Sequence, residues 1–272
     1  MCPRCHDDQA KITKKGVFKT RRGRIIQRYL CHSCLKTFSD QTTKPGFRLR
    51  RYHLRNRIFR EFCRGVAQRE IAIEHRIHRD TVARLLQAIA KEAKKQNERM
   101  RKTCSPIVVV MDEMETFEHT KCKPVSIVVA VEEGTRKILA LEAAQMPANG
   151  HLAEISRKRY GKRKDLRPGA LRKTLGYLAA FENLRLIKSD QSPRYPKYIR
   201  ECLPSVPHLT YKGRRGCVVG QGELKRGGFD PLFSLNHTCA RIRDLIKRLS
   251  RRTWCTYMVP PTLQTKIFQI AS

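Results

Sequence analysis

The chain has 272 residues, and 58 Lys and Arg against 24 Asp and Glu give it a formal net charge of +34 at pH 7. So strong a positive charge favours a polyanionic partner, with nucleic acid as the first candidate and an anionic membrane surface as the second. A hydrophobic content of 40% argues against general disorder, and no apolar run approaches the roughly 20 residues that span a bilayer. We therefore expect a soluble, intracellular protein.

Two Cys-x-x-Cys pairs stand near the start of the chain. They are formed by Cys2, Cys5, Cys31 and Cys34. Four thiolates in this spacing are the tetrahedral ligand set that a structural zinc ion prefers. The segment between the pairs predicts a β-hairpin around Arg22–Gly23, which is too small to fold without a metal. A thioredoxin-like redox motif would explain one pair but not the second, so the pattern favours a zinc ribbon over residues 1–45.

Residues 46–102 have the apolar spacing of a helix-turn-helix followed by a linker. The expected core positions are Ile71, Ala72, Ile77, Val82, Leu85 and Leu86. The second helix would enter a major groove with its N-terminal residues nearest the base edges. Its candidate DNA-binding residues are His78, Arg79, Thr81 and Arg84. The alternative is an ordinary helical hairpin with a charged outer face, and the polar run 91–102 is expected to be a fraying helix end and linker.

After Pro106 the pattern changes from helical spacing to apolar runs. Strands are expected at 107–112, on both sides of a turn at Glu133–Gly134, at 184–190 and at 208–213. A basic helical stretch separates the third strand from the fourth. This order predicts a mixed α/β sheet within residues 103–272, and the whole chain is expected to be a multidomain α+β protein.

Two of the expected strands end in aspartate, Asp112 and Asp190. Two carboxylates at the ends of adjacent strands repel each other unless a cation lies between them. Oxygen ligands suit Mg²⁺ or Mn²⁺ rather than zinc, and a pair of such ions stabilises the attacking and leaving oxygens of phosphoryl transfer. An aspartate at the end of a strand is also a common helix cap, so the pattern alone leaves both interpretations open.

In this order, a zinc ribbon, a helix-turn-helix and strands that end in aspartate resemble the DDE-type transposases of bacterial insertion sequences. Residues 235–256, LNHTCARIRDLIKRLSRRTWCT, are similar to a segment of the insertion-sequence-one-like branch that carries the third catalytic residue on a helix, followed by an Arg-Leu-x-Arg-Lys/Arg-Thr signature. Here the signature consists of Arg248, Leu249, Arg251, Arg252 and Thr253. The resemblance covers nearly the whole chain and implies a ribonuclease-H-like catalytic domain over residues 103–272.

The resemblance implies that Asp112 and Asp190 are the first two catalytic residues and hold Mg²⁺ or Mn²⁺. The third catalytic position falls on Asn236, where the family has a glutamate. An asparagine oxygen can ligate Mg²⁺ but brings no negative charge. Glu223, in a glycine-rich segment expected to be a loop, is the alternative third residue. Basic residues on the same helix as Asn236 are expected to contact the DNA backbone: Arg241, Arg243, Lys247 and Arg248.

The implied activity is that of a metal-dependent DNA transposase of the bacterial cytoplasm, associated with the nucleoid. Its partners would be double-stranded DNA, both the terminal inverted repeats and the target, and at least a second copy of the chain to join two element ends. One alternative is a catalytically inactive, domesticated DNA-binding regulator, which the neutral Asn236 favours. Another is a zinc-ribbon nuclease that processes RNA.

Overall fold

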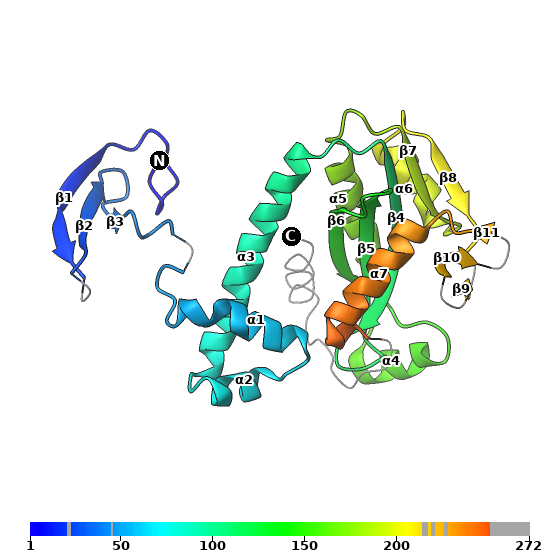
Figure 1. The fold of residues 1–272 in the computed structure, drawn as a ribbon, viewed down its shortest axis with the longest axis horizontal. Coiled ribbons are helices and arrows are strands. Elements are labelled where there is room, and N and C mark those ends of the chain that lie inside the picture. Colours follow the sequence, from blue (N-terminus) through cyan, green and yellow to red (C-terminus); the bar gives the residue numbers. More distant parts are fainter. Residues whose placement is uncertain (21–22, 45, 214–216, 219–220, 226–227, 251–272) are drawn as a thin grey trace.

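The computed structural model describes residues 1–272 except 21–22, 45, 214–216, 219–220, 226–227 and 251–272 (Figure 1). The described chain is a mixed α+β protein with a small N-terminal sheet, a group of helices and a five-stranded sheet. Among the described residues, no helix combines the length and the apolar character that crossing a bilayer requires.

The N-terminal sheet is antiparallel and lies apart from the larger sheet (Figure 1). It consists of β1 (Ile12–Lys19), β2 (Ile25–Cys31) and β3 (Thr37–Ser39). In the register of β1 with β2, Cys31 pairs with Ile12, so the end of β2 carries Cys31 toward the first cysteine pair. Only a few side chains of this sheet are buried, which is consistent with a unit that has little apolar core of its own.

Helices are present over residues 46–102, and the apolar positions predicted for a helix-turn-helix are buried or half-buried among them. The helices are η1 (Tyr52–Leu54), α1 (Arg55–Cys63), α2 (Gln68–Glu74) and α3 (Arg79–Thr103). The residues buried among these helices include Ile71, Ala72, Val82, Leu85 and Leu86, and Ile77 is half-buried in the turn. His78 is the N-cap of α3, and its Nδ1 accepts a hydrogen bond of 3.2 Å from the backbone N–H of Asp80.

The linker expected at residues 91–102 is instead the second half of α3, a helix of 25 residues. Despite its polar sequence, this half of the helix makes two hydrogen bonds to the edge strand of the larger sheet. The buried Asn97 donates to the carbonyl oxygen of Ile138 (3.3 Å), and Arg101 donates to that of Leu139 (3.5 Å). The guanidinium of Arg101 also lies 4.0 Å from the centre of the Tyr177 ring. The second half of α3 therefore packs directly on the sheet and covers backbone groups of an otherwise unpaired edge.

The larger sheet has the strand order β6-β5-β4-β7-β8 (Figure 1). Its strands are β4 (Val108–Phe117), β5 (Pro124–Glu132), β6 (Ile138–Gln145), β7 (Leu186–Asp190) and β8 (His208–Tyr211). The first three are antiparallel neighbours, whereas β7 runs parallel to β4 and β8 runs parallel to β7. The mixed sheet predicted from the apolar runs is confirmed. The expectation that the first strand ends at Asp112 is wrong, because β4 continues to Phe117 in its pairing with β5, whereas β7 does end at Asp190. A second small antiparallel sheet is formed by β9 (Cys217–Val218), β10 (Gln221–Lys225) and β11 (Gly228–Phe229).

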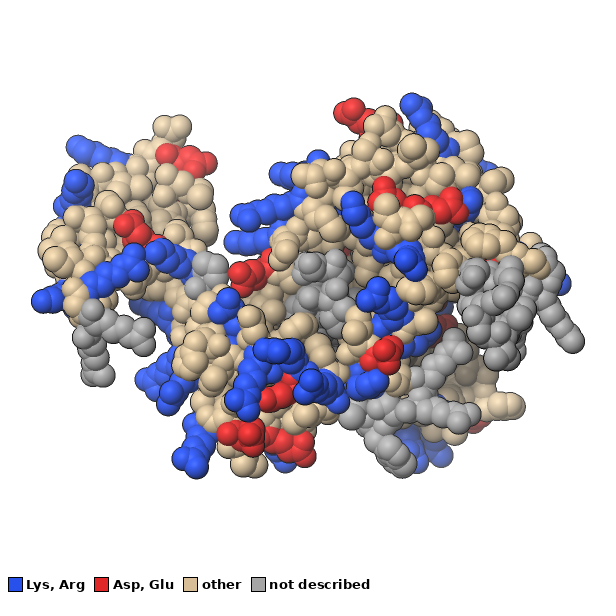
Figure 2. All heavy atoms as spheres, in the orientation of Figure 1, with Lys and Arg blue, Asp and Glu red and all other residues tan. Residues whose placement is uncertain are grey.

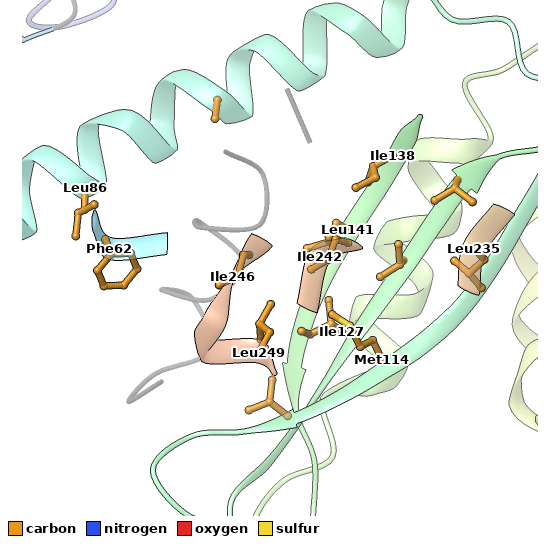
Figure 3. Close-up of a cluster of buried hydrophobic side chains, with 14 of the residues drawn as sticks. Phe62, Leu86, Met114, Ile127, Ile138, Leu141, Leu235, Ile242, Ile246 and Leu249 are labelled. Carbon is orange, nitrogen blue, oxygen red and sulfur yellow. The ribbon is translucent and has the colours of Figure 1, made fainter. Parts of the chain in front are cut away.

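The two faces of the larger sheet support two hydrophobic cores, because successive side chains of a strand point to opposite faces. On one face, Val109 and Met111 of β4 pack with α5 (Arg167–Leu178) and α6 (Arg194–Cys202). The other face belongs to a core that also contains residues of α7 (Phe233–Leu245), of η2 (Lys247–Leu249) and of the helices α1, α2 and α3. Members of this second core labelled in Figure 3 include Met114, Leu141, Ile246, Phe62 and Leu86.

Arg248 links η2 to the helix-turn-helix. Its Nη2 donates to the carbonyl oxygens of Val66 (3.2 Å) and Gly65 (3.4 Å), and its guanidinium lies 4.9 Å from the centre of the Phe62 ring. This placement gives Arg248 a structural role, and its contact with DNA stays a prediction.

We expect Arg248→Ala to lower the free energy of unfolding by about 1–3 kcal/mol, because it leaves two partly buried carbonyl groups without this donor. Thermal or denaturant unfolding measures the effect. The matched control is Lys247→Ala, whose exposed ammonium pairs only on the surface with Asp244 and should change stability by less than about 0.5 kcal/mol. Equal effects of the two substitutions would contradict the structural role.

Candidate active site and metal centre

The four cysteines of the two pairs come together into one cluster, as the sequence predicts. The Sγ atoms of Cys2, Cys5, Cys31 and Cys34 all lie within 4.8 Å of one another. Cys2 and Cys34 are 3.8 Å apart, as are Cys5 and Cys31. Tetrahedral coordination with a metal–sulfur distance of about 2.3 Å separates the sulfurs by about 3.8 Å, whereas a disulfide needs about 2.05 Å. The cluster is therefore close enough to bind one metal ion, and its geometry is compatible with structural zinc.

The two cysteine pairs are built in the same way. The residue that follows the second cysteine of each pair has a positive φ, 58° at His6 and 54° at Leu35. This left-handed conformation is uncommon outside glycine, and here it ends the turn that brings both sulfurs of a pair to the same side. The backbone N–H of Arg4 also donates to the Sγ of Cys2 at 3.4 Å, a contact that favours the thiolate.

Asp112 and Asp190 occupy neighbouring positions of two adjacent parallel strands. Met111 of β4 pairs with Ser189 of β7, so the next residue of each strand brings the two aspartates side by side, with strands about 4.8 Å apart. Both lie on the face of the sheet that α7 covers, the face to which Val110 points. The adjacent Glu113 points to the opposite face, where its Oε2 accepts from the Ser126 hydroxyl at 2.8 Å.

The electrostatics of this pair disfavour two charged carboxylates side by side. Burial and then the negative charge of Asp190 raise the pKa of Asp112 to about 6. Two hydrogen bonds to the Oδ1 of Asp112 partly oppose this shift, one from the Glu113 N–H (2.7 Å) and one from the Tyr195 hydroxyl (3.1 Å). Asp190 accepts from the Ser192 N–H at 3.0 Å. A divalent cation between the carboxylates would remove their repulsion.

Tyr195, in the first turn of α6, is a site residue that the sequence did not reveal. It is 1% exposed, and burial together with the charges of Asp112, Glu113 and Asp190 raises its pKa well above the usual range. The hydroxyl therefore stays protonated and donates to Asp112, which fixes the orientation of that carboxylate. The position of Tyr195 in the sequence, directly after the loop that follows Asp190, is the signal that could have identified it.

We expect Tyr195→Phe to weaken the binding of Mg²⁺ or Mn²⁺ at the aspartate pair about 10- to 100-fold, the usual cost of losing a group that orients a metal ligand. A titration of the purified protein with Mn²⁺ measures the change in affinity. The matched control is Tyr198→Phe in the same helix, whose ring packs in the core and faces the Arg172 guanidinium at 4.8 Å. Identical metal titrations for the two variants would show that Tyr195 has no such role.

The structure places α7 against this pair, but with Asn236 engaged elsewhere. The exposed Asn236 donates through Nδ2 to the Oδ2 of the buried Asp230 at 2.7 Å. Asp230 also accepts from the Leu232 N–H at 3.1 Å, just before the helix. One turn further along α7, burial raises the pKa of the Cys239 thiol to about 12, and the charge of Asp112 contributes to this rise. Cys239 is therefore near Asp112, which sequence reasoning did not anticipate.

The alternative third residue, Glu223, lies in the strand β10. The expectation that its glycine-rich segment is a loop is therefore wrong. Glycines on both sides of a short strand do not prevent pairing, because β10 is held between β9 and β11.

The candidate DNA-binding residues lie at the surface of two separate elements. Arg79 and Arg84 of α3 are exposed, as is the N-cap His78, and Thr81 is half-buried. On α7 and just after it, Arg241 and Lys247 are exposed and Arg243 is half-buried. On the face shown in Figure 2, Lys and Arg side chains spread over the N-terminal sheet and the helices, with a few acidic side chains among them. The signature residues Arg251, Arg252 and Thr253 lie outside the described residues.

No protein-family model matches this chain, and no curated protein matches it in sequence. The candidate site is therefore defined by geometry: two adjacent aspartates on one sheet face, an orienting tyrosine, and a four-cysteine cluster on a separate small sheet.

Proposed function

We propose that the chain is a DDE-type DNA transposase that binds the terminal inverted repeats of an insertion sequence and cleaves and joins DNA strands with Mg²⁺ or Mn²⁺. The observation that carries the proposal is the position of Asp112 and Asp190, which are neighbours on β4 and β7 and face the same side of the sheet. Two carboxylates so arranged form the minimal oxygen ligand set for a divalent cation.

The arrangement of the other elements supports the same proposal. Three antiparallel strands followed by two strands parallel to the first are compatible with the ribonuclease-H-like domain that the resemblance implies. The helix-turn-helix precedes this sheet, and α3 connects the two without a flexible linker. A reading helix held rigidly to the catalytic sheet would set a fixed spacing between the recognised sequence and the cleaved bond.

Each residue of the proposed site has a defined task. Asp112 and Asp190 would hold the cation, which supplies positive charge to the phosphate and lowers the pKa of a bound water. Tyr195 holds the Asp112 carboxylate in one orientation. Because the Nδ2 of Asn236 donates to Asp230, its amide oxygen is the atom with which it could serve as a neutral ligand. The cysteine cluster would hold zinc and fold the ribbon for DNA binding.

The proposal is tested by incubating the purified protein with labelled DNA that carries the inverted repeats flanking its coding region, with and without Mg²⁺. Nicking at the repeat ends is expected, and it should be lost in Asp112→Ala and Asp190→Ala. The matched control is Asp244→Ala, which removes an exposed carboxylate of α7 whose ion-pair partner within the described residues is Lys247. Cleavage of RNA with indifference to the repeats would favour an RNA-processing nuclease instead.

A second candidate function is a DNA-binding regulator without catalysis. The observation in its favour is that α7 presents a neutral residue, Asn236, at the position of the family glutamate and a protonated thiol, Cys239, near Asp112. This function predicts binding to the repeats without nicking at any Mg²⁺ concentration. The same assay therefore separates the two candidates.

A further inference from the structure

A dense basic stretch between β6 and β7 has no role in the site described above. Residues 157–167, RKRYGKRKDLR, contain seven Lys and Arg and a single acid, Asp165. They form the end of α4 (Leu152–Tyr160), the loop after it and the start of α5. Five of the basic side chains are exposed: Arg157, Lys158, Arg159, Lys162 and Lys164. Such a run is costly to hold together unless a polyanion offsets its repulsion.

The loop is fixed in place by the one buried guanidinium within it. Arg163 donates through Nη2 to Glu118 (2.9 Å) and through Nε to the carbonyl oxygen of Met146 (3.2 Å). The Leu166 N–H donates to the carbonyl oxygen of Gln145 at 3.1 Å. These bonds attach the loop to the ends of β4 and β6. Because Arg163 points inward, its neighbours Lys162 and Lys164 are held at the surface rather than on a loose segment.

The acidic groups of this region do not cancel its charge. Asp165 accepts from the Nε of Arg167 at 2.8 Å, and this pairing lowers the pKa of Asp165. Glu118 is buried against Arg163, so the exposed acid on α4 is Glu154. Between α4 and the loop is a cleft of about 850 Å³, lined by Arg157, Lys162, Arg163 and Lys164 among others. Asp165 also lines the cleft, and within the described part of the chain its exposed cations Arg157, Lys162 and Lys164 form no ion pair.

The helix α4 and the loop after it lie at the end of the sheet toward which β4 runs (Figure 1), and Asp112 lies within β4 before that end. The five residues from Asp112 to Phe117 advance about 16 Å along the strand. That distance is about five base-pair steps of 3.4 Å. A duplex with its cleaved bond at the aspartates could reach the basic surface within half a helical turn.

We propose that α4 and the loop after it, residues 157–164, bind the phosphate backbone of duplex DNA beside the bond that is cut. The inference rests on the proposed function for its position relative to the cleaved bond, and it assigns a contact separate from the helix-turn-helix. Lysine and arginine contacts to phosphates carry no sequence information, but they fix the register of the duplex on the protein. The surface thus positions DNA while the helix-turn-helix reads it.

The test is a salt titration of DNA binding by the full chain with Asp112→Ala, so that cleavage does not interfere. The variant carries Arg157→Gln, Lys162→Gln and Lys164→Gln, which retain side-chain length and remove three exposed charges. With a mixed-sequence duplex, the slope of log affinity against log salt should fall by about 0.9 for each phosphate that the variant no longer neutralises, or about 2–3 in total. Affinity at low salt should fall at least tenfold.

The matched control removes three equally exposed charges from α3, with Lys91→Gln, Lys94→Gln and Lys95→Gln. Its slope should change by less than about 1. Equal reductions of DNA affinity in the two triple variants would show that the loss follows from net charge alone, and this would overturn the proposal. Stronger binding of the full chain, through residues 157–164, to vesicles of anionic lipid than to duplex DNA would also overturn the proposal.

These experiments distinguish a failure of the DNA-binding surface at residues 157–164 from a failure of the proposed function. A selective loss of DNA binding in the α4 variant supports the surface even if the protein with intact Asp112 never nicks DNA, in which case the transposase proposal fails alone. Conversely, normal nicking and normal binding by a chain with the three α4 substitutions would refute the surface and leave the transposase proposal standing.

Discussion

Replacing Asp112 or Asp190 by alanine is expected to lower the rate of Mg²⁺-dependent DNA cleavage about a thousandfold or more. The physical reason is that a divalent ion contributes several kcal/mol to transition-state stabilisation, and each tenfold in rate is about 1.4 kcal/mol. Single-turnover cleavage of labelled repeat DNA measures the reduction in rate, with DNA affinity measured in parallel. Cleavage by either alanine variant at more than about a tenth of the normal rate would contradict a metal site built on this pair.

In the metal-free protein, Asp112 should also make the free energy of unfolding depend on pH. The pKa of Asp112 is raised from 3.8 to about 6, so the folded chain binds this proton more tightly than the unfolded chain. The free energy of unfolding should therefore fall as pH rises from about 4 to about 6, by up to about 3 kcal/mol. Asp112→Asn should remove this decrease and melt at a higher temperature than the unsubstituted, metal-free protein at pH 7, whereas Asp244→Asn should not.

Removal of the metal from the cysteine cluster is expected to unfold the N-terminal sheet. Structural zinc contributes about 10–16 kcal/mol of binding free energy in small zinc domains, and this energy is folding energy. Elemental analysis should find one zinc per chain, and chelation or Cys31→Ser should make residues 1–45 sensitive to protease. The two hydrophobic cores should survive, because neither includes a residue of this sheet.

The matched control for the cysteine cluster is Cys202→Ser, a half-buried thiol in α6 outside the cluster, which should keep its zinc. Protease resistance of residues 1–45 after complete removal of metal would contradict the account. So would the recovery of disulfides within the cluster from protein purified under reducing conditions.

The parts of the fold that the sequence predicted are those with a short-range cause. The cysteine cluster follows from two identical local turns, and the core of the helix-turn-helix follows from the spacing of Ile71, Leu85 and their neighbours. Asp112 and Asp190 are found from apolar runs that stop in acid. Each of these patterns lies within a short stretch of sequence, so it is recognised without knowledge of contacts between distant segments.

The parts that were missed depend on contacts between distant segments. The second half of α3 looks like a linker because most of its residues are polar, and its packing on β6 becomes evident from the hydrogen bonds of Asn97 and Arg101. Tyr195 becomes a site residue because the crossover from β7 turns its hydroxyl toward Asp112, 83 positions earlier. The hydrogen bond of Asn236 to Asp230 likewise depends on how the segment before α7 is folded.

In the proposed function Asp112 and Asp190 together hold a divalent cation, and crystals grown with Mn²⁺ would reveal that ion. Manganese replaces Mg²⁺ at oxygen sites and gives an anomalous signal that locates the ion. We expect an anomalous peak within bonding distance of a carboxylate oxygen of both aspartates, and no such peak in crystals of Asp190→Ala. Saturating Mn²⁺ with no peak between the two carboxylates, or a peak that persists in Asp190→Ala, would contradict the proposed site.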